Sequence, residues 1–480
     1  MGKYCVPKEI RDLKPKGKMV KAVNGQYYVY NYKNIKDENG KWKVKMGEIV
    51  GKITLENGFI PNGSMANDSP DIIEFGQYKI ILDLTKSIYD LLEKFFDKVD
   101  AMAIYNLATI HFINDFTFIK NVKSFYDMSY LSIKYPTVNM GYNSLCELLT
   151  NLGCKTKRVR ALEQYLIDNS SKKIAIDGHD IKSYSNENDL ASNGNKYQTF
   201  KSPQINVLMA YDIETKTPLA SKTYDGSMLD KTSVKDFLDL YAFKNTLFVI
   251  DAGFYSNDNL NLFSKNDCKY IIPLSRNLKE YKEATADMNL NENFVYETSN
   301  KRTVIEYKCY STANKKVYIF RDLNQSVLEK ADYIKNMASL PDKYNQEKFN
   351  EINDYFGTIV LTSNYDIKPE EIFKLYKQRW KIETFFNYFK NGVQYNNIHF
   401  EDYYKTQGLS FIMLIVGLMY KEVMKQIEKI KGLSLNDLLL KGRFIKASKR
   451  GDYWYLANIK KDTKCILDTL NISIESKFKF

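Results

Sequence analysis

The stretch YKQRWKIETFFNYFK, residues 376–390, combines the side chains that metal-dependent phosphate chemistry needs. Four polar residues are spaced along it: Tyr376, Arg379, Glu383 and Lys390. At about 100° per residue they share an arc of about 60° on one face of a predicted helix. An acid flanked by two cations, with a phenol beside it, can hold a metal ion against a phosphate. The alternative interpretation is a solvated helix face that only carries charge.

The neighbouring face of the same helix, between about 180° and 280°, is apolar and predicts burial in a core. It consists of Leu375, Ile382, Phe385, Phe386 and Phe389. A helix that is packed on one side would hold its polar face in a fixed position.

Two further acids follow apolar runs that are typical of buried strands. Asp177 ends the run KKIAID, and Asp251 ends the run NTLFVID. In an open α/β sheet, groups at the carboxyl ends of strands project into the ligand crevice. Each Asp could instead start a turn or cap a helix. Together with Glu383, however, they form a set of three carboxylates that one fold can bring together.

Three carboxylates without a His or Cys cluster favour a hard ion, Mg²⁺, with Mn²⁺ as a substitute. Two such ions roughly 4 Å apart would activate the attacking oxygen and stabilise the leaving oxygen of a phosphodiester. Arg379 would bind a phosphate through two parallel hydrogen bonds, and Lys390 would bind one as a point charge. We expect Tyr376 to donate a hydrogen bond to a phosphate oxygen rather than to act as a nucleophile.

Several neighbours of Asp177 are weaker candidates. Asp180 is a competing first acid, ranked lower because Asp177 lies directly at the predicted strand end. His179 lies between them and could touch DNA or a metal-bound water, although a lone His more often has a structural role. The following loop offers three DNA-contact candidates that the sequence does not rank: Asn188, Lys196 and Tyr197.

The composition favours a polyanionic partner. The 480 residues include 70 Lys and Arg against 58 Asp and Glu, a net charge of +12. Such an excess is common in proteins that bind nucleic acid, although an AT-rich genome also enriches Lys, Asn and Tyr. The six scattered cysteines form no zinc-knuckle or disulfide pattern. The N-terminal residues lack a signal-peptide core, and the apolar run 409–420 is too short for a bilayer, so we expect a cytoplasmic protein without membrane contact and a buried helix at 409–420.

The hydrophobic pattern along the chain predicts an α/β core with a ribonuclease-H-like mixed sheet. A β-rich insertion interrupts this core, and small β-rich and helical regions flank it. A helix-turn-helix at 142–170 is conceivable, but a packed bundle is favoured there. The predicted regions are a small basic β-rich module (1–85), a helical region with a DNA-binding role (86–170), the first part of the core (171–275), the insertion (276–356), the second part of the core (357–400) and a helical C-terminal region (401–480).

These residues resemble the DDE transposases of bacterial insertion sequences, specifically the insertion-sequence-four superfamily. The resemblance rests on IDGHDIKS around Asp177, on VIDAGFYSNDNL around Asp251, and on the spaced residues of 376–390. Further matching stretches are NDLASNGNKY, QINVLMAYDIETKTPLA and GSMLDKTSVKDFL, so the likeness covers about residues 172–400. The N-terminal segment YVYNYKN…GEIVGKITLENGFIPN also looks like one branch of that superfamily.

The resemblance implies a ribonuclease-H-like catalytic domain in which Asp177, Asp251 and Glu383 bind two Mg²⁺ ions. It implies cut-and-paste transposition, with cleavage at the ends of a mobile element and joining of its 3′-hydroxyls to target DNA. The implied partners are double-stranded DNA, as terminal inverted repeats and as target, and a second subunit that completes a homodimer in the DNA complex. The implied location is the bacterial cytoplasm, at the nucleoid during the reaction.

One feature departs from the family pattern. Some relatives release the element through a DNA hairpin, aided by a Trp of the inserted region that stacks on a flipped base. Here the three Trp residues lie outside 276–355. Stacking by another aromatic residue would have to replace it, with Tyr281, Phe294 and Tyr296 as candidates. The sequence therefore leaves the excision route open.

Two other functions remain to be weighed. A ribonuclease-H-like nuclease would cut DNA without joining strands, but it has little need of the long basic flanking regions. A catalytically inactive DNA-binding derivative is disfavoured because all three acids and both cations are present.

Overall fold

The computed structural model forms two compact units, Met1–Ile72 and Ile73–Phe480. Its described residues are all except 1–5, 37–39, 57, 62–71, 184, 186–187, 194–202, 229, 266, 300, 313, 393–396, 399, 401, 458 and 480.

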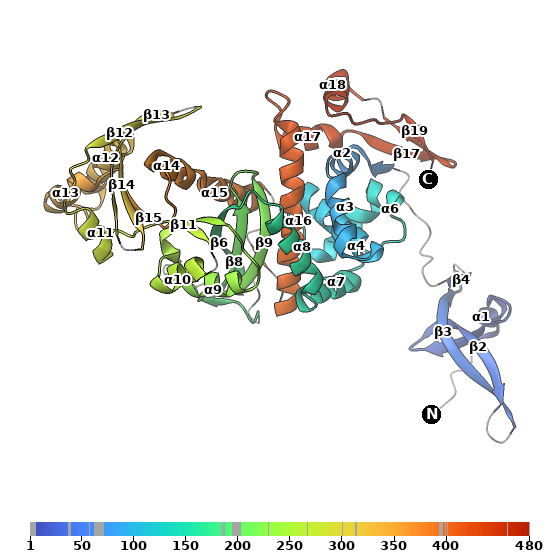
Figure 1. The fold of residues 1–480 in the computed structure, drawn as a ribbon. Helices are drawn as coiled ribbons and strands as arrows, with labels where there is room; N and C mark the ends of the chain where they lie inside the picture. Colours follow the sequence, from blue (N-terminus) through green and yellow to red (C-terminus); the bar gives the residue numbers. More distant parts are fainter. Residues whose placement is uncertain are drawn as a thin grey trace. The chain divides into compact units, whose positions relative to one another are not determined.

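The first unit is a small antiparallel sheet with one helix packed on it (Figure 1). A hairpin turn at Asn24 and Gly25, both with positive φ, joins the first two strands as the Asn-Gly pair predicts. Ile10 of the helix packs with Val29 and Ile53 of the sheet in a separate small core. The elements are α1 (Lys8–Asp12), β1 (Met19–Val23), β2 (Gln26–Lys36), β3 (Trp42–Thr54) and β4 (Gly58–Pro61).

The second unit is built on a large mixed sheet. Its central strands follow the order β9-β8-β6-β10-β11. β8 runs antiparallel to both of its neighbours, β9 and β6, whereas β10 and β11 run parallel to β6. The bounds are β6 (Lys173–Ser183), β8 (Pro203–Asp212), β9 (Thr217–Asp225), β10 (Leu247–Ile250) and β11 (Lys269–Pro273), with two short strands, β7 (Ser192–Asn193) and β16 (Asn397–Ile398), at its margins.

The β-rich stretch after β11 extends this same sheet. β15 pairs antiparallel with β11, and β14, β13 and β12 follow in that order. The chain between 276 and 356 thus lengthens one edge of the central sheet. Within it, two consecutive helices connect β14 to β15. The elements are α11 (Lys279–Ala284), β12 (Glu292–Thr298), β13 (Lys301–Ser311), β14 (Lys316–Asp322), α12 (Leu323–Ser339), α13 (Gln346–Ile352) and β15 (Thr358–Ser363).

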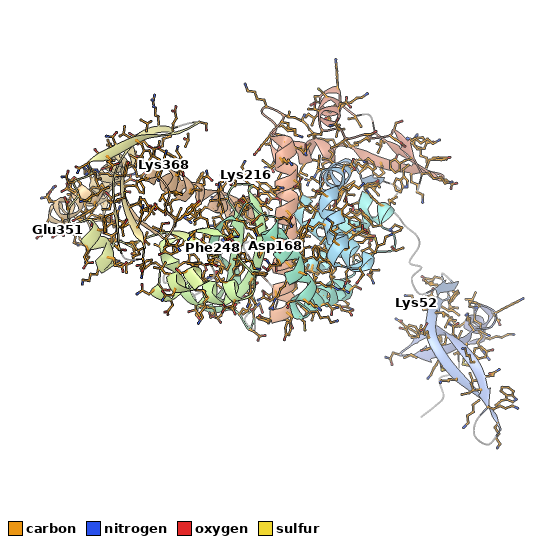
Figure 2. The ribbon with its side chains drawn as sticks, in the orientation of Figure 1. Lys52, Asp168, Lys216, Phe248, Glu351 and Lys368 are labelled. Atoms are coloured by element: carbon orange, nitrogen blue, oxygen red, sulfur yellow. The ribbon has the colours of Figure 1, made fainter. Side chains whose placement is uncertain are left out.

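Alternate residues of β6 and β10 face two different cores. Ile176 and Phe248 belong to the core shared with α9 (Asp230–Asp239) and α10 (Asn257–Lys265). Figure 2 labels Phe248, which is fully buried there. Ala175 and Val249 point the other way, into the core shared with α14 (Pro369–Gln378), α15 (Trp380–Asn387) and α16 (Tyr403–Ile427). This second face carries the candidate site.

The long helix α16 runs between the sheet and a bundle of helices (Figure 1). It is buried from Leu409 to Met419, which confirms the predicted buried helix. The expectation that this apolar segment is too short for a bilayer is wrong in one respect, because the helix has 25 residues. Among the described helices it is the one long and apolar enough to cross a membrane, and 72% of its most apolar window is buried inside the structure.

The remaining elements surround α16 and close the second unit. A small sheet of order β19-β18-β17-β5 accompanies the C-terminal helices, so the 401–480 region is not purely helical. The elements are β5 (Ile72–Glu74), α2 (Gly76–Leu84), α3 (Lys86–Phe95), α4 (Lys98–Ile113), α5 (Ile119–Asp127), α6 (Tyr130–Lys134), α7 (Tyr142–Cys154), α8 (Lys157–Asp168), α17 (Leu435–Arg443), β17 (Lys446–Arg450), β18 (Tyr453–Leu456), α18 (Lys461–Thr469) and β19 (Lys477–Phe478).

Two glycines allow α7 and α16 to cross in close contact. A Cβ at Gly408 would lie 2.1 Å from the carbonyl oxygen of Leu149, and one at Gly153 would lie 1.9 Å from that of Tyr404. Since both contacts are to backbone, the helices themselves would have to separate. We expect Gly408→Ala to lower the free energy of unfolding by roughly 2–3 kcal/mol, measured by denaturant titration. In an exposed helix the same change stabilises by about 1 kcal/mol, so a stabilised variant would contradict this packing.

Candidate active site

The register of the central sheet places two of the predicted acids side by side. β6 and β10 pair in parallel, and Ile176 lies opposite Ile250. Asp177 and Asp251 are the next residues of these strands, which are about 4.8 Å apart where they pair. Both acids continue the face that packs toward α15, because residues two apart along a strand share a side.

The prediction that Asp177 ends its strand is wrong. β6 continues to Ser183, held by antiparallel pairing with β8. What ends at Asp177 is the parallel pairing with β10, because Asp251 caps the 3₁₀ turn Ala252–Phe254 and its Oδ1 accepts a hydrogen bond from the Ala252 N–H (2.7 Å). Among the described strands, none pairs with this edge of β6 between Asp177 and Ile181. The two strands therefore diverge beside the acids.

The helix predicted over residues 376–390 is interrupted. α14 ends at Gln378 and α15 begins at Trp380, with Arg379 at the junction. The junction has helical angles (φ −52°, ψ −34°) but tighter hydrogen bonds, from Arg379 N–H to the carbonyl of Tyr376 and from Ile382 N–H to that of Arg379, both 3.0 Å. A π-helical turn, Tyr388–Gly392, follows α15. The helical path continues through the junction, so the polar face is kept.

Arg379 links the helix to the sheet. Its Nη2 lies 2.5 Å from Oε1 of Glu383, and its Nη1 lies 3.7 Å from Oδ2 of Asp177. Its Cζ lies 5.9 Å from the ring centre of Tyr376. The Arg379 side chain is only 12% exposed, against 37% for Glu383. One largely buried cation therefore contacts three of the predicted site residues.

The electrostatics show that Asp251 shares the same space. Burial raises the pKa of Asp177 to about 6, and the charges of Asp251 and Glu383 add to the rise, against the opposing effects of Arg379 and of the Gly178 N–H. Burial alone would lower the pKa of Arg379, yet that pKa is raised, with the largest upward effect from Asp251. The three predicted acids and the predicted arginine thus converge.

Tyr376 belongs to the same cluster. Burial raises the pKa of its phenol, and the charges of Asp251 and Glu383 raise it further, while Arg379 lowers it. The phenol therefore keeps its proton at neutral pH and can donate a hydrogen bond. The hydrogen bond to a phosphate oxygen that is expected of Tyr376 requires this protonated state.

The other candidates differ in their surroundings. Lys390 lies on the π-helical turn, exposed, seven residues beyond Glu383. The His179 ring stacks on Phe386, with ring centres 5.3 Å apart, and lines a small cavity beside α16. Asp180 lies on the opposite face of β6 from Asp177, since neighbouring residues of a strand alternate.

The loop and insertion candidates mostly have structural roles. Asn188 is buried, and its Nδ2 donates a 2.5 Å hydrogen bond to the carbonyl of Phe400. Tyr281 and Phe294 are buried as well, and Tyr296 packs on Phe373 with ring centres 5.2 Å apart. These four aromatic and amide groups thus have structural contacts. Lys196 and Tyr197 lie outside the described residues.

A cavity of about 490 Å³ that the sequence did not lead us to expect lies on another flank of α15. It is lined by aromatic and cationic side chains from β8, the following turn, α15 and α16, including Tyr211, Lys216, Trp380, Lys381 and Tyr420; Figure 2 labels Lys216. Trp380 is 63% exposed. The one signal in the sequence was a Trp directly after Arg379, next to the polar face of the predicted helix. Most of the other lining residues come from distant segments.

The chemical type of the residues at the site suits a divalent ion. Three carboxylates that face one space offer the hard oxygen ligands that Mg²⁺ prefers. Within the described part of the chain, however, no group of three His, Cys, Asp or Glu side chains already lies as a metal site would require. Arg379 instead bridges Asp177 and Glu383. Binding of an ion therefore requires the contact between Arg379 and Glu383 to open.

The raised pKa of Asp177 predicts that an ion competes with a proton. Below a pH of about 6 this carboxyl is protonated, so the affinity for Mn²⁺ should fall by up to about tenfold per pH unit as the pH decreases. Above a pH of about 7 this group should cause no further change. Calorimetric titration of the DNA-free protein with Mn²⁺ between pH 5 and 8 measures the effect, and a flat profile would remove Asp177 from the ligand set.

A known family model spans all three acids of the site. A family model described as "Transposase DDE domain" matches residues 168–418, more than half of the chain and all three acids. A solved structure, the cryo-EM structure of the piggyBac transposase synaptic complex with hairpin DNA, is similar over 73% of this chain and 71% of that chain, at 11% identity and a TM-score of 0.38. No curated protein sequence matches. On the family match, with Asp177, Asp251 and Glu383 inside it, the chain belongs to the DDE transposase domain family.

Proposed function

We propose that the protein is a cut-and-paste transposase of the insertion-sequence-four superfamily, encoded by a bacterial insertion sequence. It cleaves DNA at the ends of its element and joins the 3′-hydroxyl ends to target DNA. The observation that carries this proposal is the convergence of Asp177, Asp251 and Glu383 around Arg379. The order β9-β8-β6-β10-β11 supports a ribonuclease-H-like core, and membership of the family supports the activity.

We assign Asp177, Asp251 and Glu383 as the ligands of two Mg²⁺ ions, for which Mn²⁺ can substitute. Such ions, when bound, activate the attacking oxygen and stabilise the leaving oxygen of a phosphodiester. The protein's contribution is rigidity. Two of the acids come from neighbouring strands of a buried sheet, and Glu383 comes from α15, whose other side is buried through Ile382, Phe385 and Phe386.

Arg379 positions the phosphate. In the DNA-free protein it neutralises Asp177 and Glu383. A phosphate can accept two parallel hydrogen bonds from a guanidinium, so bound DNA competes with Glu383 for Arg379 and leaves that carboxylate available to an ion. Tyr376 lies against the guanidinium and donates its own hydrogen bond to a phosphate oxygen. Lys390, exposed further along, meets a neighbouring phosphate.

The DNA partner is double-stranded, first as the terminal inverted repeats of the element and then as the target. Two copies of the chain form a homodimer in this complex. The net charge of +12 favours binding to such a polyanion.

The proposal is tested with a supercoiled plasmid that carries the DNA flanking both sides of the protein's own reading frame. With Mg²⁺ or Mn²⁺ we expect breaks at the two ends of the element and, with a second plasmid as target, a joined product. Chelation with EDTA should abolish both, and a plasmid without the flanks is the control. Breaks without joined product would favour a nuclease, and binding without breaks would favour an inactive DNA-binding derivative; either result overturns transposition.

A further inference from the structure

The first unit carries a β-ribbon that is longer than its own sheet requires. β1 pairs with β2 only over Gln26–Tyr30, and β4 pairs with β3 only over 51–54. Beyond these pairings, β2 and β3 continue as a two-stranded ribbon to Lys36 and Trp42 (Figure 1). Two register shifts next to Tyr30 separate the ribbon from the sheet and increase its twist. Among the described strands, none covers the edges of this ribbon.

One face of the ribbon is cationic. Lys33 lies directly opposite Lys45, and Lys43 lies opposite Ile35. Residues of alternate cross-strand pairs share a face, so Lys33, Lys43 and Lys45 define what we call the lysine face. All three side chains are exposed. Like charges directly opposite one another destabilise a strand pair, so the Lys33 and Lys45 pair does not stabilise the ribbon, and an anionic ligand would offset their repulsion.

The charge of the first unit is concentrated beyond what its size explains. Residues 1–72 contain thirteen Lys and Arg against eight Asp and Glu, a net charge of +5 out of the +12 of the whole chain. The opposite face of the ribbon is also unusual, because Trp42 is 68% exposed and the Lys36 Nζ lies 5.2 Å from its ring centre. The ribbon therefore presents charge on one side and an exposed aromatic ring on the other.

We propose that this ribbon docks in the major groove of duplex DNA, with the lysine face turned into the groove. A major groove of B-form DNA is about 12 Å wide and admits a two-stranded ribbon, whose strands are about 4.8 Å apart. Lys33 and Lys45 come from different strands and reach the phosphates of opposite walls. The choice of duplex DNA over other polyanions rests on the proposed function. A double-stranded RNA does not fit, because its major groove is deep and narrow.

The test uses the full-length protein in EDTA, so that no cleavage occurs, and a fluorescent 30-base-pair DNA duplex of arbitrary sequence as the probe. The double variant Lys33→Gln, Lys45→Gln should raise Kd roughly 10- to 30-fold at about 0.15 M salt. The slope of log K against log salt should become shallower by about 2, because two phosphate contacts are lost. The matched control, Lys8→Gln with Lys16→Gln, removes the same charge from exposed positions of the same unit and should change Kd less than threefold.

Each result decides the matter. Equal weakening by the two double variants would mean general charge attraction and would overturn the docking. Equally tight binding of a double-stranded RNA of the same sequence would overturn the groove geometry. The thermal unfolding midpoint of the Lys33, Lys45 variant should be unchanged or higher, since a like-charge pair is removed. Because these measurements need no metal, failure of the cleavage test would leave them intact, and failure here would leave the metal chemistry intact.

Discussion

Asp177→Asn is expected to reduce Mg²⁺-dependent DNA cleavage by about 1,000-fold or more, while the affinity for duplex DNA stays within about threefold. The amide has nearly the same size as the carboxyl but carries no charge, so it cannot replace a metal ligand that faces both Asp251 and Glu383. Cleavage is measured on the flanked plasmid and binding is measured in EDTA, so that the two effects are separated.

The same substitution should stabilise the DNA-free protein at alkaline pH. The pKa of Asp177 is raised from its ordinary value of 3.8 to about 6 in the folded protein. Its ionised form therefore destabilises the fold above a pH of about 6, by up to about 3 kcal/mol. Asparagine carries no charge, so the gain should be fully present at pH 8, shrink as the pH falls through 6, and vanish below about 4. Denaturant titrations in EDTA at these three pH values measure it.

Asp180→Asn is the matched control, because it makes the same change three residues further along β6. Asp180 lies on the other face of the sheet, so cleavage should remain close to that of the unmodified protein. If Asp180→Asn abolished cleavage and Asp177→Asn spared it, the assignment of the first acid would be reversed. A loss in both variants together with a loss of DNA binding would point to a damaged fold.

The position of the two sheet acids was open to prediction because it depends on local pattern. An apolar run that ends in Asp indicates a buried strand with an acid at its margin, and two such parallel strands place the acids at one edge. The extension of β6 beyond Asp177 could not be predicted, since the segment that follows is polar and mixed. Its strand conformation depends on antiparallel pairing with β8, where His179 lies opposite Val207. Long-range pairing of this kind leaves little trace in the segment itself.

The helical segment of the site was likewise predictable from the sequence only in part. Its 3.6-residue pattern correctly indicated which side of α15 is buried, through Ile382, Phe385 and Phe386. The break at Arg379 could not be predicted, because no Pro or Gly marks it. The contact between Arg379 and Asp177 also joins residues some 200 positions apart, and no local pattern encodes it. Spacing alone grouped Lys390 with the others, but in the structure it lies on a π-helical turn, where the 3.6-residue period no longer holds.

Arg379→Ala is expected to move two measurements in opposite directions. Without the guanidinium, Asp177 and Glu383 lose the cation that bridges them, so the DNA-free protein should bind Mn²⁺ about tenfold more tightly. Cleavage should nevertheless fall about 100-fold, because the phosphate loses the fork that orients it. Calorimetry with Mn²⁺ in the absence of DNA and the plasmid assay at saturating Mn²⁺ measure the two effects independently.

Arg379→Lys separates charge from geometry, because it retains the cation but not the planar fork. Its affinity for Mn²⁺ should stay near that of the unmodified protein, and its cleavage should lie between that of the alanine variant and that of the unmodified protein. Tighter Mn²⁺ binding with full cleavage in Arg379→Ala would make the arginine a competing cation without a role toward phosphate. Unchanged Mn²⁺ binding would mean that the bridge between Asp177 and Glu383 does not occupy the site of the ion, and that the acids open by another movement.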